Sequence, residues 1–405
     1  MTDAPPPVSV ADPPPVQRLS PARIIATVWL AVFATSLFFR AVDPIIPKIA
    51  ASLNEPFHRV ALLATAFALP YALTQPFLGA AADVFGKTRM MFACLVLVTI
   101  ATFAGAFAPN LEILMATRVV AGIVAGGTFP IALALVADVV PVEKRQVAVG
   151  RILAGGMLGN LLGASTSGIV GDFVDWRGVF ILNGCCAAAA MIAAYIGFGG
   201  PGRKPPRTVD LRAVPASYRA LFANPLAKFC FGAVLLEGIF LMGAFPFIAP
   251  FLHDAGETRA TIAGLVIGSF GIGGMLYSFI IPWLLPRLKQ RRLMMLGGLL
   301  MGLGLMALSL APPWQQQALI FVMFGLAFYL LHGTIQIIVT ELVPSARGSA
   351  AATHSTFFFF GQSVGPIYYG FAFAQTGHVL PLIAGALVLI ATGIVCGIYL
   401  GQRPR

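Results

Sequence analysis

The chain has 405 residues, of which 58% are hydrophobic and only 10% are charged. Soluble domains carry roughly 25% charged residues, so this composition excludes an ordinary soluble protein and indicates an integral membrane protein. The net charge of +11 would also suit a nucleic-acid binder, and the positions of the cations decide between the two. The five cysteines lie in apolar runs without the spacing of a metal site or a disulfide framework.

Apolar runs near or above the ~18 residues that indicate a membrane span recur along almost the whole chain. The first half contains runs at 24–46, 60–78, 90–108, 111–140, 148–170 and 179–198. The second half contains runs at 226–251, 262–285, 293–310, 316–343, 349–373 and 379–400. The sequence therefore predicts an all-α membrane protein with twelve transmembrane helices.

The Lys and Arg residues are unevenly shared between the two sides of these spans. Most of the 26 fall on the side of the two termini, and the opposite side holds Lys48, Arg59, Arg177 and Arg259. Cytoplasmic loops carry the excess of basic residues. We therefore expect a multi-pass protein of the inner (cytoplasmic) membrane with both termini in the cytoplasm. Its basic surplus would face anionic lipid headgroups and not nucleic acid.

The two halves of the chain resemble each other. Asp138-Val-Val-Pro141 is echoed by Glu341-Leu-Val-Pro344, and the glycines of the fifth span recur in the eleventh. Such parallel repeats are typical of transporters that bind substrate between the two units. We expect a disordered tail at 1–22, a six-helix bundle at 23–200, a cytoplasmic central loop at 201–224 and a second six-helix bundle at 225–402.

A short polar interruption at 79–89 joins the second and third spans. Its Gly86-Lys87-Thr88 ends like a phosphate-binding loop, but Ala81 stands where an earlier glycine is required, and a helix precedes it where a strand should. Nucleotide hydrolysis is therefore excluded at this site. We expect no cofactor, and a proton gradient as the source of energy.

This interruption reads Gly-x-x-x-Asp-x-x-Gly-Lys-x-Arg and resembles the signature loop of the major facilitator superfamily. Arg118 with Gly122, Pro141 with Lys144-Arg145, and Trp176-Arg177 match further family positions, so the resemblance covers about residues 22 to 402. It implies two six-helix bundles that rock about a central cavity. It also implies a cytoplasmic gating loop in which Asp83 pairs with a partner such as Arg145. The residues of this loop are Gly79, Asp83, Gly86, Lys87, Arg89 and Arg145.

The fifth span resembles the antiporter motif of twelve-span drug:proton antiporters. The matching residues are Gly150, Gly159, Gly163 and Gly168, with Ala164 in place of a proline and Ser167 in place of a glycine. The resemblance favours export. Small residues spaced along a membrane helix also allow close helix packing whatever the function, and that alternative stays open.

Charged residues inside membrane spans are costly and need a reason. Arg40 and Asp43 lie three residues apart, a spacing at which side chains on one helix meet. They form either a mutually neutralising pair at the membrane interface or part of a functional site. Arg118 matches a family arginine associated with proton transfer, and the resemblance implies the same role here.

Glu237 falls near the middle of the seventh span with no basic residue within one turn. Burial without a partner favours the protonated carboxyl, so Glu237 is a candidate proton carrier. The alternative is a permanently protonated acid that hydrogen-bonds a neighbouring helix. His332 is a secondary candidate, because histidine is the side chain whose ordinary pKa lies near neutral pH. The other polar side chains expected in the cavity are Tyr71, Gln75, Asn160, Gln336 and Gln362.

We expect a monomeric, proton-coupled secondary transporter that exports small amphipathic or drug-like molecules. Its partners would be that substrate, protons and the lipid bilayer. The main alternative is an uptake symporter or facilitator for a sugar, organic acid or amino acid. An intramembrane enzyme is disfavoured, because no Ser/His/Asp, metal-ligand or paired-carboxylate constellation occurs at workable spacing. A membrane sensor that binds without transport is a further alternative.

Overall fold

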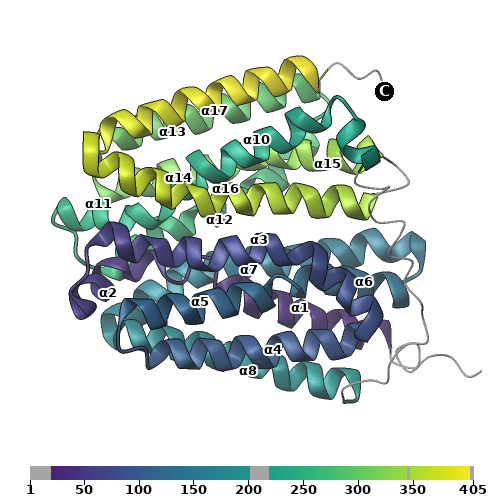
Figure 1. The fold of residues 1–405 in the computed structure, drawn as a ribbon. Coiled ribbons are helices and arrows are strands. Elements are labelled where there is room, and N and C mark those ends of the chain that lie inside the picture. Colours follow the sequence, from purple (N-terminus) through teal and green to yellow (C-terminus); the bar gives the residue numbers. More distant parts are fainter. Residues whose placement is uncertain (1–19, 201–218, 344–346, 402–405) are drawn as a thin grey trace, which may run out of the picture.

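The computed structural model describes residues 20–200, 219–343 and 347–401. Its helices run roughly along one common axis, and the helices of the two halves of the chain form two groups (Figure 1). One end of the assembly, which we call the terminal face, holds the start of α1 and the end of α17. The other end, which we call the opposite face, holds α2 and α11. The chain between residues 20 and 401 contains no strand in these described ranges.

Helices make up both halves of the chain. In chain order, the first half comprises α1 (Pro21–Leu37), η2 (Asp43–Ile45), α2 (Ile46–Leu53), α3 (Phe57–Phe85), α4 (Lys87–Ala106), α5 (Leu111–Ala125), α6 (Thr128–Val139), α7 (Val142–Phe173) and α8 (Trp176–Phe198). The second half comprises α10 (Ala227–Phe240), η3 (Met242–Phe247), α11 (Ile248–Asp254), α12 (Ala260–Leu284), α13 (Gln290–Ser309), α14 (Trp314–Phe328), η4 (Tyr329–Gly333), α15 (Thr334–Leu342), α16 (Arg347–Thr376) and α17 (Val379–Tyr399).

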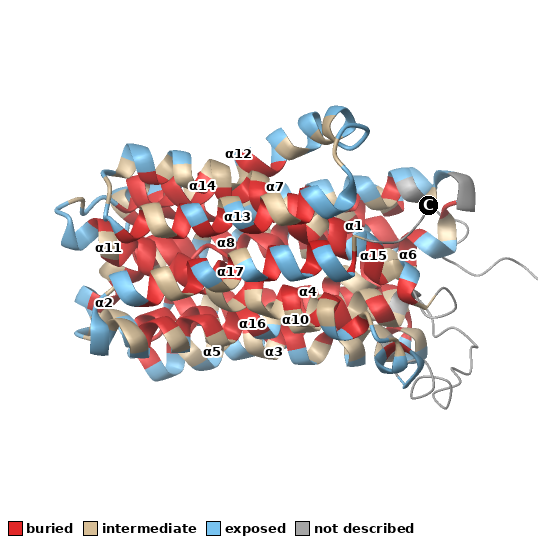
Figure 2. Ribbon diagram, turned by 90° about the horizontal axis from the view of Figure 1, so that it is seen from above, coloured by how far each residue is buried: buried red, intermediate tan, exposed pale blue. Residues whose placement is uncertain are grey.

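The predicted twelve-helix architecture is confirmed. Ten helical stretches of the described residues are long and apolar enough to cross a membrane, and α1 is a shorter apolar helix. The remaining helix, α16, has 30 residues and is therefore about 45 Å long. Buried residues follow the inward sides of the helices, and exposed residues gather on the outer sides and at the ends (Figure 2). Large apolar side chains such as Ile100 and Leu387 are among those exposed, as expected for a protein surrounded by lipid.

The first span is not the continuous helix predicted at 24–46. α1 ends at Leu37, an irregular turn follows, and the chain resumes as the short 3₁₀ helix η2 and then α2. Pro44 and Pro47 lack the N–H that an uninterrupted helix needs, and each stands in the first turn of a new helix. The apolar run hid this break because the residues on both sides of it are buried and hydrophobic. The second half has the same break, between α10 and α11 through η3.

The interruption at 79–89 is also more helical than the predicted loop. α3 continues to Phe85 and α4 begins at Lys87, so Gly86 alone separates them. Gly86 has φ +98°, a backbone conformation that only glycine adopts without a steric cost. The segment is therefore a sharp turn between two helices.

Glycines at equivalent places in the two halves make equivalent close contacts. A Cβ atom on Gly122 would overlap the carbonyl of Phe67, and a Cβ atom on Gly325 would overlap the carbonyl of Phe270. Helices in a membrane gain attraction mainly from close packing, which small residues permit. The repeat seen in the sequence is therefore also a repeat of helix contacts.

We expect Gly325→Ala to destabilise the protein by about 1–3 kcal/mol, because the added methyl group must separate α14 from α12. A lower midpoint of thermal unfolding in detergent would show this. Gly232→Ala in α10 is the matched control, since no atom lies within 4 Å of its new Cβ. The control should be neutral or slightly stabilising, and equal unfolding midpoints for both variants would contradict the packing role of Gly325.

Candidate functional site

A cavity of about 500 Å³ lies between the two halves of the chain. Its walls come from α7 and the turn after α1 on one side, and from η3, α12, α14, η4 and α16 on the other. Most lining side chains are Phe, Met, Leu or Ile, and the polar exceptions are Arg40, Asn160, Ser278, Tyr329 and Gln362. This size and lining are typical of sites for drug-sized molecules.

The turn after α1 brings Arg40 and Asp43 together inside the protein. Arg40 Nη1 donates to Asp43 Oδ2 at 3.2 Å, with Arg40 only 8% exposed and Asp43 fully buried. Arg40 Nη2 also donates to Met242 Sδ at 2.9 Å, and the guanidinium carbon lies 4.3 Å from the centre of the Phe245 ring. The expected contact therefore exists, but not on one continuous helix. Both side chains are buried where η2 contacts α7 of the first half and η3 and α12 of the second.

Arg118 of α5 lies beside this pair. It is buried, with Nη2 donating to the Phe38 carbonyl at 3.1 Å and Nε to the Leu63 carbonyl at 3.4 Å. The Phe38 carbonyl is available because α1 has already ended there. Arg118 also acts electrostatically on Asp43. The group of Arg40, Asp43 and Arg118, which we call the arginine cluster, thus contains one carboxylate and two guanidinium groups.

Glu237 of α10 is not the partnerless acid that the sequence predicted. Its Oε2 lies 2.8 Å from His332 Nδ1, and both side chains are buried. Spacing along one helix could not reveal this partner, because His332 comes from another helix of the same half. His332 lies in η4, a π-helical turn within the tenth span. Such turns often mark functional sites.

A second histidine, His354 of α16, completes this group, which we call the acid–imidazole cluster. Its ring centre lies 4.7 Å from that of His332, and it is also buried. His354 was not among the predicted site residues, because it lies close to the end of its span. Within the described residues, Glu237 Oε1 and His354 Nε2 are buried without a hydrogen-bond partner. Unsatisfied buried polar atoms are rare in proteins and often mark function.

An aromatic layer separates the acid–imidazole cluster from the cavity. Phe328 lies 4.4 Å and Phe358 lies 4.8 Å from the His332 ring, measured between ring centres. Both phenylalanines also line the cavity, whereas Glu237 and His332 do not. Neither phenylalanine was predicted to belong to the site. The cluster is therefore one side chain away from any molecule bound there.

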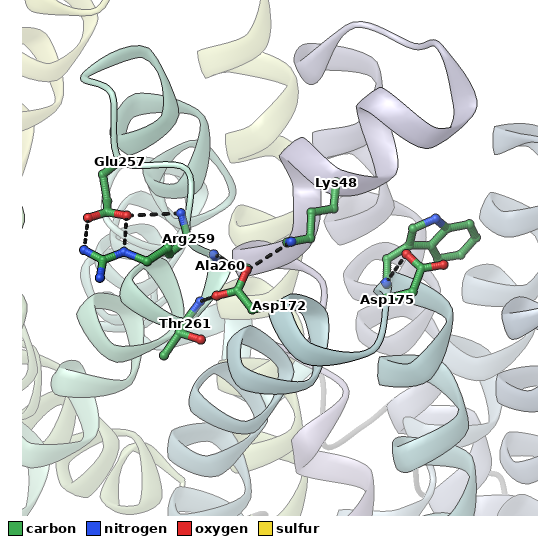
Figure 3. A network of polar contacts seen from close by, with 8 residues as sticks. Lys48, Asp172, Asp175, Glu257, Arg259, Ala260 and Thr261 are labelled. Atoms are coloured by element: carbon green, nitrogen blue, oxygen red, sulfur yellow. Dashed lines mark hydrogen bonds and ion pairs between the residues drawn. The ribbon is translucent and has the colours of Figure 1, made fainter.

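The two halves of the chain are joined by hydrogen bonds near the opposite face. Asp172, near the end of α7, accepts hydrogen bonds from the backbone N–H groups of Ala260 at 3.0 Å and Thr261 at 2.7 Å (Figure 3). These N–H groups begin α12 and have no partner within their own helix. Lys48 pairs with the same carboxylate at 3.0 Å. We call this arrangement of Asp172, Lys48 and the start of α12 the opposite-face lock.

A sequence model of the Major Facilitator Superfamily matches residues 28–366. The chain belongs to the major facilitator superfamily. It is 25% identical over 389 residues to the MFS-type transporter YfhI of Bacillus subtilis, a match that covers 93% of each chain. It is 26% identical over 361 residues to the multi-drug resistance efflux pump PmrA of Streptococcus pneumoniae, covering 86% of this chain and 89% of that one. The crystal structure of a D-xylose-proton symporter superposes with a TM-score of 0.74 at 14% identity, covering 94% of this chain and 97% of that one.

As in other members of this superfamily, the activity of the chain is transport and not enzymatic catalysis. The superfamily signature segment forms ion pairs, but not the expected one. Lys87 Nζ lies 2.7 Å from Asp138 Oδ2 and 3.6 Å from Asp83 Oδ1. Arg145 Nη2 instead donates to the Ala137 carbonyl at 2.7 Å, at the end of α6. The predicted pairing of Asp83 with Arg145 is therefore wrong, because Arg145 satisfies free carbonyls at a helix end. Asp138 is the acid that sequence reasoning missed.

The glycines that resemble the antiporter motif have a packing role. Cβ atoms on Gly159 and Gly163 would overlap backbone carbonyls of α1, and one on Gly168 would overlap the Ala260 carbonyl of α12. Gly361 and Gly365 make the same kind of contact with α10. Gly150 differs, since its Cβ would meet no atom within 4 Å. Close packing therefore accounts for three of the four glycines without reference to the direction of transport.

The remaining predicted residues are divided between the cavity and its surroundings. Asn160 and Gln362 line the cavity together with Arg40. Tyr71 is buried and packs edge-on against Phe39 and Phe359, each at 4.7 Å between ring centres. Tyr71 thus supports two cavity-lining rings from behind. Gln75 is buried, Gln336 is exposed, and neither lines the cavity.

We expect Asp172→Ala to open the opposite face more often, because two hydrogen bonds to a carboxylate and one ion pair are lost. Spin labels would be placed at the exposed positions Ser52 and Asp254, with the five native cysteines replaced by serine. Double electron–electron resonance spectroscopy would then show a larger population of long distances between the two labels. Asp175→Ala is the matched control, since both contacts of Asp175 lie at the start of its own helix: it accepts from the N–H of Trp176, and Arg177 lies 3.8 Å away.

A second control is the ion pair of Glu257 and Arg259 in the adjoining loop. Arg259 donates to Glu257 at 2.8 Å, and this hydrogen bond holds the pKa of the Glu257 carboxyl below its ordinary value. The hydrogen bonds of this pair are confined to one loop, so Glu257→Gln should leave the distance distribution unchanged. An unchanged distribution in Asp172→Ala as well would contradict the role of the opposite-face lock.

Proposed function

We propose that this protein is a proton-coupled secondary transporter that exports small amphipathic or apolar molecules by alternating access. The observation that carries the proposal is the buried Glu237–His332 pair, placed one aromatic layer behind an apolar cavity. A transporter of this type needs a group that gains and loses a proton. It also needs a site for cargo that senses the change.

The acid–imidazole cluster has the composition of a proton carrier. Glu237 offers one oxygen to His332 and leaves the other without a partner, and His354 contacts the His332 ring. Adding or removing one proton changes the charge of the cluster, and an uncompensated buried charge is costly. The packing of α10, η4 and α16 must respond to that change. Phe328 and Phe358 then pass the response to the cavity, because each touches both His332 and the cavity space.

The opposite-face lock would be one of the two gates. In the proposed cycle the lock holds while cargo enters the cavity from the terminal face. It must break when cargo leaves on the other side. With both chain ends in the cytoplasm of a cell's inner membrane, as the distribution of basic residues predicts, the state with the lock closed faces the cytoplasm. An exporter loads its cargo from that side.

Export is supported by the similarity to the efflux pump PmrA, which is 26% identical. The alternative is an uptake symporter or facilitator for a small metabolite. It is kept because packing alone explains Gly159, Gly163 and Gly168. The likeness to the D-xylose-proton symporter concerns the fold and carries no weight for the direction of transport.

Proteoliposomes with a pH-sensitive dye inside separate these possibilities. Under an exporter, substrate that moves outwards drives protons inwards, so the two fluxes have opposite directions. Under a symporter both fluxes have the same direction. Substrate flux without any proton movement would contradict proton coupling.

We expect Glu237→Gln to abolish substrate accumulation driven by an imposed proton gradient, down to the level of protein-free vesicles. The amide has nearly the same shape but cannot bind and release a proton, so the fold and substrate binding should persist. Thermal unfolding and binding measured without a gradient check these two points. Glu112→Gln is the control, because Glu112 pairs with Arg59 on the surface. Full gradient-driven accumulation in Glu237→Gln would exclude Glu237 as the proton carrier.

A further inference from the structure

The charge of the cavity wall indicates which cargo it accepts. Within the described part of the chain, Arg40 is the one charged side chain that lines the cavity, and no Asp or Glu does. A bound organic cation would therefore lack a counter-ion at the wall, since Asp43 lies behind Arg40 and already pairs with it. A bound anion would meet a guanidinium group directly.

The hydrogen bonds of Arg40 leave room for a ligand. A guanidinium group has five N–H donors, and a thioether sulfur is a weak acceptor. Within the described residues the Arg40 side chain makes two hydrogen bonds, one to the Asp43 carboxylate and one to Met242 Sδ. Met242 also lines the cavity. A carboxylate in the cavity could therefore replace the sulfur and form a stronger, charge-assisted hydrogen bond.

The charge balance of the arginine cluster points to a single negative charge on the ligand. With all three groups ionised, Arg40 and Arg118 carry two positive charges and Asp43 carries one negative charge. One more negative charge from the ligand makes the arginine cluster neutral, whereas a dianion would leave one unpaired negative charge. Buried charges are tolerated when they are paired and hydrogen-bonded.

The remainder of the wall suits an apolar body. Phe245 lies beneath the Arg40 guanidinium, and Phe270, Phe328 and Phe358 continue the aromatic surface. Met157 and Met275 add flexible side chains that adapt to ligands of different shape. Aromatic ligand rings pack well against such faces.

We propose that the cavity binds organic monoanions, in which an aromatic or aliphatic body carries one carboxylate, and that the carboxylate binds Arg40 in place of the Met242 sulfur. This inference names the substrate class of the proposed transporter. The claim that monoanions are transported rests on the proposed function, whereas the claim that they bind rests only on the cavity.

Three probes with the same naphthalene body test the proposal by calorimetric titration of the purified protein near neutral pH. They are 2-naphthoate, the neutral 2-naphthamide and the cationic 2-naphthylmethylammonium. We expect naphthoate to bind about tenfold to a hundredfold more tightly than the amide, the range given by a hydrogen bond to a charged group. The ammonium probe should bind most weakly. Equal or tighter binding of the ammonium probe would overturn the proposal.

Variants test the role of Arg40 itself. Arg40→Gln should remove the preference for naphthoate over naphthamide, and Arg40→Lys should keep part of it. Asp43→Asn should strengthen naphthoate binding, because a neutral amide no longer competes for the guanidinium, and this gain cannot result from misfolding. Arg59→Gln, which removes a surface arginine paired with Glu55 and Glu112, should leave the preference unchanged. An unaltered preference in folded Arg40→Gln, or no gain in Asp43→Asn, would contradict the assignment.

Failure of this inference is distinguishable from failure of the proposed function. Proton-coupled flux of a cation or a neutral compound, without naphthoate binding, would preserve the function and refute the substrate class. Naphthoate binding without proton-coupled flux would preserve the assigned ligand class and refute the proposed function. Decanoate serves as a further probe, because a membrane fatty acid and a soluble aromatic acid share the same carboxylate chemistry. Its affinity relative to naphthoate shows which source fits the cavity better.

Discussion

Two arginines buried between helices are the constraint on which the central part of this structure depends. A guanidinium group inside a membrane protein must find acceptors, because no water is available to supply them. The break after Leu37 provides these acceptors. It frees the Phe38 carbonyl for Arg118, and it turns Asp43 inwards to Arg40. An unbroken first helix would have used the Phe38 carbonyl in its own backbone hydrogen bonds and removed an acceptor from Arg118.

The same break places Arg40 at the junction of the two halves. Its contacts with Met242 and Phe245 are to the element that interrupts the equivalent helix of the second half. The cavity therefore lies where both broken helices meet, and irregular backbone is tolerated there because it is enclosed by protein. This arrangement joins the arginine cluster to the cavity directly. Phe328 and Phe358, by contrast, lie between the acid–imidazole cluster and the cavity.

Close packing occurs both within and between the halves, whereas the contact of Asp172 with the start of α12 adds charge and hydrogen bonds between them. Glycines hold α7 against α1 and α16 against α10 within each half, and these contacts have no charge. Asp172 instead joins the two halves through backbone N–H groups at the start of α12, which a polar or charged group must satisfy. Packing contacts within a half can persist while the halves move. Under the proposed cycle, the contacts between the halves at the start of α12 are those that must break.

The sequence by itself determined the features that depend on local composition. Apolar runs of sufficient length predict membrane helices because the bilayer admits few other structures, and the recurring glycines reveal the repeat. It also identified Arg40, Asp43, Arg118, Glu237 and His332 as unusual, because charge inside an apolar run is rare. It did not reveal the break at Leu37, since apolar residues flank it on both sides.

Only the tertiary structure decided which of these residues meet. Glu237 and His332 are far apart in the sequence, and spacing along one helix cannot pair them. Likewise, Arg145 donates to a carbonyl at the end of α6, and Lys87 forms an ion pair with Asp138. The family resemblance had instead predicted an ion pair between Asp83 and Arg145. Residue type and spacing limit which side chains can interact. The packing of distant helices selects the partner, because the energy of a buried charge depends on what surrounds it in space.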